Sequence, residues 1–129
     1  MTMLPYSIII ESESSDFWRY NIVVMGEALV AEQRVDFVKY RRDVAEVGAN
    51  LSAAPAGISE GCRVELTTKA ADSLILYIYC IPHSLPITDD VDSRLNSELL
   101  VSICNADGEL YRRRHIVSAW SGCNIEVRL

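Results

Sequence analysis

The sequence lacks the features that mark membrane-spanning and metal-binding proteins. Its longest unbroken apolar run, Leu74–Ile81, has eight residues, whereas a membrane-spanning helix needs about 20. It contains only two histidines, and no CxxC pair occurs among its four cysteines, Cys62, Cys80, Cys104 and Cys123. These absences argue against a transmembrane helix and against the common zinc-binding motifs.

Positive charge is also scarce. The chain has 12 Lys and Arg against 18 Asp and Glu, which gives a formal net charge of −6. Such a chain lacks the positive field that attracts nucleic acid or anionic membranes, so we expect neither as a partner. The first residues, MTMLPYSIIIESES, have no basic stretch before their broken apolar run, unlike a signal peptide. We therefore expect a cytoplasmic protein, or an extracellular one if a leader has been removed.

Recognisable catalytic motifs are missing. The sequence has no glycine-rich phosphate loop and no nucleophilic serine motif, and neither His83 nor His115 lies in a cysteine-nucleophile motif. Cys80 and Cys104 end apolar, strand-like runs, where a thiol behaves as a small hydrophobic side chain. This pattern favours four buried, inert thiols. In a secreted protein two disulfides could form instead, with three pairings open.

The patterning of the chain predicts its fold class. Half of the residues are hydrophobic and 23% are charged, which is typical of a globular protein, and the length suits one domain, residues 1–129. Alternating apolar and polar runs recur between turn residues, at intervals of about ten residues. We expect a two-sheet antiparallel β-sandwich of seven or eight strands, similar in general architecture to Ig-like and C2-like sandwiches. The expected strands are 6–11, 17–25, 29–40, 62–68, 74–81, 98–104, 109–120 and 123–129.

The segment 34–48 is ambiguous. Its β-branched and aromatic residues up to Tyr40 favour a strand. Val44 and Val47 follow at helical spacing, so a short helix near 40–48 is the alternative. We expect a strand to about Tyr40 and then a helical turn or an irregular segment.

The central strand is expected over Leu74–Ile81, because the run is apolar on both faces. One face carries Leu74, Leu76, Ile78 and Cys80, and the other carries Ile75, Tyr77, Tyr79 and Ile81. In a sandwich only the first face meets the core, so the second needs a cover. Two covers are open. One is a partner protein or a second copy of the chain, with Ile75, Tyr77, Tyr79 and Ile81 as the interface. The other is the segment 34–48 folded as a helix.

Two charged stretches are candidate ligand sites. Asp89, Asp90 and Asp92 place three carboxylates in a short loop that could bind Ca²⁺. Their spacing does not fit an EF-hand, and an exposed acidic turn is the plainer interpretation. We expect no cofactor other than such a calcium ion.

The second stretch is basic. Arg112 and Arg114 fall on one face of an extended strand, where they could bind phosphate or sulfate. The alternative is that they solvate an outer face and pair with acidic neighbours. Trp120, beside a turn, could stack on a sugar ring, whereas Trp18 is better placed in the core.

The leading functional hypothesis is a non-catalytic binding or interaction module that contacts protein. The alternatives are a carbohydrate-binding or calcium-binding sandwich, and an enzyme whose residues are too dispersed to form a motif.

Overall fold

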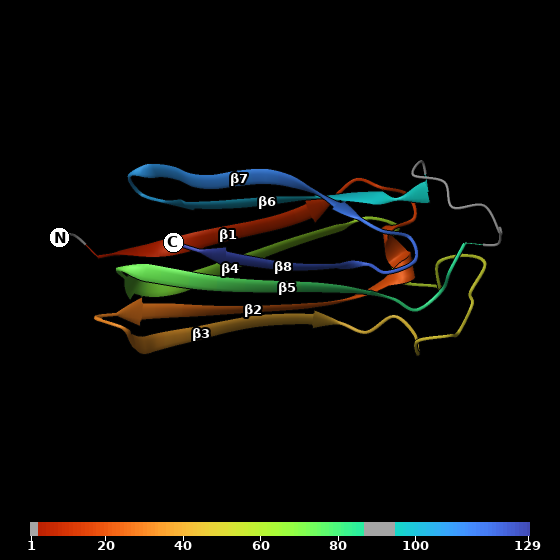
Figure 1. The fold of residues 1–129 in the computed structure, drawn as a ribbon, viewed down its shortest axis with the longest axis horizontal. Helices are drawn as coiled ribbons and strands as arrows, with labels where there is room; N and C mark the ends of the chain where they lie inside the picture. Colours follow the sequence, from red (N-terminus) through yellow and green to blue (C-terminus); the bar gives the residue numbers. More distant parts are fainter. Residues whose placement is uncertain (1–2, 87–94) are drawn as a thin grey trace.

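The computed structural model describes residues 3–86 and 95–129 of the chain. Over these residues it contains eight strands and one short 3-10 turn, η1 (Phe17–Arg19). The strands pair antiparallel in two four-stranded sheets that face one another (Figure 1). The prediction of an all-β, two-sheet sandwich is therefore confirmed.

Each sheet takes strands from distant parts of the chain. The first sheet has the order β4-β1-β6-β7. Its strands are β4 (Cys62–Ala71), β1 (Leu4–Ser12), β6 (Ser97–Asn105) and β7 (Gly108–Val117). The second sheet has the order β3-β2-β5-β8. Its strands are β3 (Gln33–Arg42), β2 (Tyr20–Val30), β5 (Ser73–Pro82) and β8 (Cys123–Arg128). Among these strands, only the pairs β2–β3 and β6–β7 are both consecutive in the sequence and adjacent in a sheet. Both hairpins turn at the left end of Figure 1.

The two hairpins differ in how well the sequence predicts them. The β6–β7 hairpin turns between the two strands expected at 98–104 and 109–120: the Asp107 N–H donates to Asn105 Oδ1 at 2.9 Å, and Gly108 has a φ of +133° that favours glycine. The β2–β3 hairpin turns at Ala31 and Glu32, inside a stretch predicted to be strand. Their φ angles are +49° and +67°, although neither residue is a usual turn former.

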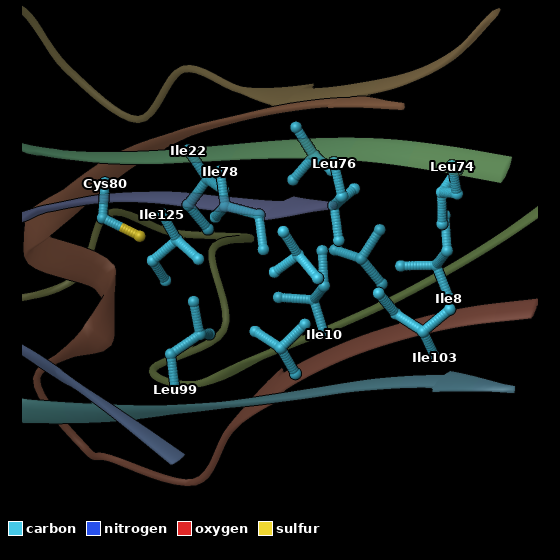
Figure 2. Packing of buried hydrophobic residues seen from close by; sticks show 14 of the residues in the cluster. Ile8, Ile10, Ile22, Leu74, Leu76, Ile78, Cys80, Leu99, Ile103 and Ile125 are labelled. Atoms are coloured by element: carbon cyan, nitrogen blue, oxygen red, sulfur yellow. The ribbon is translucent and has the colours of Figure 1, made fainter. Parts of the chain in front are cut away.

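The core lies between the sheets and is built from every second residue of their strands (Figure 2). Inward alternation of this kind is what a half-buried strand produces. The aliphatic side chains that are fully buried include Ile8, Ile10, Ile22, Leu74, Leu76, Ile78, Leu99 and Ile103. Trp18 in η1 is 4% exposed, so its predicted placement inside the protein is confirmed.

Strand β5 has the two faces that the sequence predicts. It lies inside the second sheet, between β2 and β8. Its inward face, Leu74, Leu76, Ile78 and Cys80, is at most 2% exposed. Its outward face carries Ile75, Tyr77, Tyr79 and Ile81, of which the first three are partly exposed and the last is 43% exposed.

The expected strand to about Tyr40 followed by an irregular segment is confirmed. The alternative, a short helix near 40–48, is wrong, and so is the helical cover over β5. The chain continues as β3 to Arg42 and then runs as turns and bends. The Asn21 side chain explains the difference. Its Oδ1 accepts the Val44 N–H at 2.7 Å, and its Nδ2 donates to the Ala45 carbonyl at 2.7 Å. These contacts occupy backbone groups that a helix would use internally.

Candidate functional site

The outward surface of the second sheet is the main candidate site, and we call it the outer face. It consists of three rows of side chains that cross all four strands. In the order β3, β2, β5, β8, the rows are Phe37-Glu27-Ile75-Arg128, Lys39-Met25-Tyr77-Glu126 and Arg41-Val23-Tyr79-Asn124.

The middle row, Lys39-Met25-Tyr77-Glu126, shows the pattern most clearly. Met25 pairs with Lys39 on one side and with Tyr77 on the other, and Tyr77 pairs with Glu126. The two inner strands therefore contribute apolar and aromatic groups, and the two outer strands contribute opposite charges. An apolar centre with a charged border is the usual anatomy of a protein interface.

Charged side chains at the border are partly engaged with one another. Arg128 Nη2 donates to Glu126 Oε1 at 2.9 Å, and this contact raises the pKa of the exposed Arg128 guanidinium. Glu27, the one acidic residue on the inner strands, lies 3.4 Å from Arg34 Nη1. Because a carboxylate can accept more than one donor, Glu126 remains able to receive a second cation.

A shallow hollow of about 520 Å³ runs along β2 and β3 within the outer face. Val23, Met25 and Phe37 contribute apolar groups to its lining, and Lys39 and Arg41 contribute charged groups. Just after the end of β3, the backbone of Val44 and Ala45 is hydrogen-bonded to the Asn21 side chain. Among residues 3–86 and 95–129, no helix or strand packs over the outward side of the three rows.

The structure brings Arg112 and Arg114 together on the outward surface of the first sheet. They line a hollow of about 420 Å³ with three carboxylates, Glu11, Glu13 and Glu98. Arg114 Nη1 lies 3.9 Å from Glu98 Oε2. Because carboxylates outnumber guanidinium groups there, the surroundings favour internal charge pairing over a bound anion.

Trp120 does not join these arginines. It lies in the turn between β7 and β8, half-buried, and its backbone N–H donates to Ser118 Oγ at 3.2 Å. The candidate calcium ligands Asp89, Asp90 and Asp92 lie outside the described residues. Within 3–86 and 95–129, no group of three or more His, Cys, Asp or Glu side chains is arranged to hold a metal ion.

All four cysteines are free thiols. Cys80 is buried and faces Cys123 across the β5–β8 pair, whereas the other three are partly buried. The contact with Cys123, together with burial, raises the pKa of Cys80. Burial likewise raises the pKa of Cys62 to about 11.

Thiol labelling should report this difference in burial. We expect Cys80 of the native protein to react with a maleimide much more slowly than the other cysteines, because burial hides its sulfur and disfavours the reactive thiolate. Peptide mass spectrometry after timed labelling measures each site, and labelling in urea supplies the fully reactive control. Fast native labelling of Cys80 would contradict the buried placement.

A buried network around His83 was not predicted, because no motif in the sequence marks it. His83 Nε2 lies 2.7 Å from the Trp18 carbonyl, and its Nδ1 lies 2.7 Å from Ser84 Oγ, which accepts the Leu51 N–H at 2.8 Å. This pattern fits a neutral ring that donates from Nε2 and accepts at Nδ1. His83 and Ser84 are at most 1% exposed. The pair therefore joins three connecting segments rather than offering an open nucleophile.

His83 should make the stability of the protein depend on pH. Burial lowers the pKa of His83 below its usual value of 6.5, and Arg19 and Arg42 act in the same direction. Below about pH 6.5, His83 therefore binds a proton in the unfolded chain but not in the folded protein. The free energy of unfolding should consequently fall as the pH falls. Urea unfolding at about pH 7.5 and about pH 5.5 measures the effect.

His83→Gln should reduce this pH dependence. His115 adds to the pH dependence of stability in the same direction, because burial and Arg113 lower its pKa. His115→Gln is therefore measured beside His83→Gln to separate the two contributions. An unchanged pH dependence in His83→Gln would contradict a neutral His83 in the folded state.

Comparisons of the chain with protein-family models, with curated proteins and with solved structures found no match. The part of the chain that the structure describes contains no helix of the length and apolarity needed to cross a membrane.

Proposed function

We propose that the protein is a non-catalytic interaction module that associates with a second copy of the same chain through the outer face of its second sheet. The observation that carries this proposal is the uncovered outward side of β5. Ile75, Tyr77, Tyr79 and Ile81 have no helix or strand packed over them among the described residues. Exposed apolar surfaces of this kind on a globular domain commonly mark a binding site for a protein or another ligand.

The outward surface of the first sheet differs in character, and the contrast supports the choice of face. Its rows carry charged or hydroxyl groups at most positions, including Arg63, Glu65, Ser102 and Arg112. The inner strands of the second sheet instead carry Val23, Met25, Ile75, Tyr77 and Tyr79 outward. Tyrosine and methionine are enriched at protein interfaces, because they bury a large area while staying compatible with water.

The size of the face indicates a weak dimer. Strands β2, β3 and β5 have 10 or 11 residues and β8 has six. At about 3.3 Å per residue and about 4.8 Å between strands, the four together present roughly 600 Å² to a partner. A standard interface buries about 800 Å² on each partner. We therefore expect dissociation constants in the micromolar range.

Sedimentation of purified protein tests the proposal. The wild type should dimerise as its concentration rises through the micromolar range, and the double variant Tyr77→Glu/Tyr79→Glu should stay monomeric. Two carboxylates buried without partners in the contact would oppose association strongly. Circular dichroism and the melting temperature verify that the variant is folded.

Ile116→Glu is the matched control. Ile116 is an exposed apolar residue on β7 in the first sheet, so the same kind of charge is added away from the proposed contact. It should dimerise like the wild type. A wild type that sediments as a monomer throughout this range would overturn the proposal.

A further inference from the structure

We infer that the two copies pack outer face to outer face, with each strand running in the same direction as its counterpart in the other copy. Lys39 of each copy then lies opposite Glu126 of the other. This arrangement rests on the proposed self-association and adds its geometry and its specificity. The inference comes from the charge order along the middle row, Lys39-Met25-Tyr77-Glu126.

Two face-to-face arrangements keep the strands of both sheets aligned. In the first, the two-fold axis runs along the strands between β2 and β5. That rotation places β3 over the β8 of the other copy and β2 over its β5, and it maps the middle row onto itself. Lys39 then faces Glu126, and Met25 faces Tyr77, twice in each dimer.

In the second arrangement, the two-fold axis runs across the strands. Each strand then lies over its own copy, so Lys39 faces Lys39 and Glu126 faces Glu126. Like charges placed opposite one another oppose association and disfavour this arrangement. The charge order of the row therefore selects the first arrangement.

The neighbouring rows are compatible with the first arrangement. Phe37 lies opposite Arg128, a pair that can form a cation–π contact. Val23 lies opposite Tyr79, which extends the apolar centre. Glu27 lies opposite Ile75 and keeps its own cation, Arg34, at 3.4 Å.

The twist of the sheets does not separate the charged pair. Aligned sheets cross at about 30°. With strands about 4.8 Å apart, Lys39 and Glu126 lie about 7 Å from the axis, so the crossing shifts them by about 4 Å. The flexible lysine side chain can span that offset. Among the described residues, no carboxylate lies within 4.0 Å of Lys39 in the single chain.

Charge reversal tests the arrangement. We expect Lys39→Glu and Glu126→Lys each to weaken self-association about tenfold, because each replaces two attractive pairs by two repulsive ones. A 1:1 mixture of the two variants should associate about as well as the wild type, because both charged contacts of the mixed dimer then join a glutamate to a lysine. The double variant Lys39→Glu/Glu126→Lys should recover wild-type association by itself.

Sedimentation at low and high salt measures each species, and the melting temperature verifies folding. A mixture of the two variants that associates more tightly than the wild type, while neither variant alone is weakened, would overturn the inference in favour of the second arrangement, because like charges would then face one another in the wild-type dimer. A wild-type dimer that neither reversal weakens would also overturn it, while leaving the proposed self-association standing. A monomeric wild type would contradict the proposed function itself.

Discussion

Replacing Gly122 with alanine should lower the free energy of unfolding by more than about 3 kcal/mol. Gly122 lies in the turn between β7 and β8, where it exchanges backbone hydrogen bonds with Ser118 at 2.9 and 3.1 Å. Its φ is +73°, in the left-handed region that favours glycine. A Cβ atom there would overlap the backbone oxygen of Cys80 and come within 2.9 Å of the Pro82 ring. Neither group can move aside as a flexible side chain could.

Gly57→Ala is the matched control for this variant. Gly57 has a similar φ of +85°, but a Cβ atom there would meet nothing within 4 Å. Alanine at this position should therefore cost only the backbone preference, about 1 kcal/mol. Urea unfolding measures both variants. Equal losses at the two positions would show that the packing of the turn against Cys80 is not the cause.

Local alternation made the faces of β5 predictable. Leu76 and Tyr77 fall on opposite sides of any extended strand, whatever sheet the strand joins. The length and apolar character of the run also predicted its position inside a sheet. Both properties are local, so one sequence suffices to infer them.

The β2–β3 turn was not predictable, because a residue far along the chain stabilises it. The Asp72 carboxylate accepts the Ala31 N–H at 3.0 Å, and the Asp72 N–H donates to the Leu29 carbonyl at 2.9 Å. These contacts help to hold Ala31 and Glu32 at positive φ without a glycine or an asparagine. Asn21 acts similarly on Val44 and Ala45, which is why the helical spacing after Tyr40 produced no helix.

Only part of the candidate site was accessible from the sequence. The outward residues of β5 follow from alternation, but their neighbours depend on strand order, which no single sequence pattern contains. Lys39 and Glu126 are 87 residues apart in the chain. They share a row only because β2 and β5 lie between β3 and β8. The charge order from which the dimer arrangement is inferred therefore becomes visible only in the folded protein.

Replacing Ile78 with alanine should lower the free energy of unfolding by about 3 to 4 kcal/mol. Ile78 is fully buried in the middle of β5, where it pairs with Val24 on β2 and Ile125 on β8 (Figure 2). Truncation removes three carbons from the core and leaves a cavity that the neighbouring strands can close only partly. The midpoint of urea unfolding should fall by about 1 to 2 M.

Two further variants test the cause of that loss. Ile78→Val should cost about 1 kcal/mol, so the series remains measurable even if the alanine variant is mostly unfolded. Ile116→Ala removes the same atoms from a side chain that is 68% exposed, and it should change stability by less than about 0.5 kcal/mol. A loss below about 1 kcal/mol in Ile78→Ala would contradict the placement of this face in the core.

The inward and outward faces of β5 should therefore respond in opposite ways. Ile78→Val should lower stability and leave the association of folded molecules unchanged, because its side chain never reaches the outer face. Tyr77→Glu/Tyr79→Glu should abolish association and leave the core intact. Sedimentation and urea unfolding of both variants separate the two effects. Loss of association in Ile78→Val at concentrations where it is fully folded would mean that the contact depends on the packing of the core as well as on the outer face.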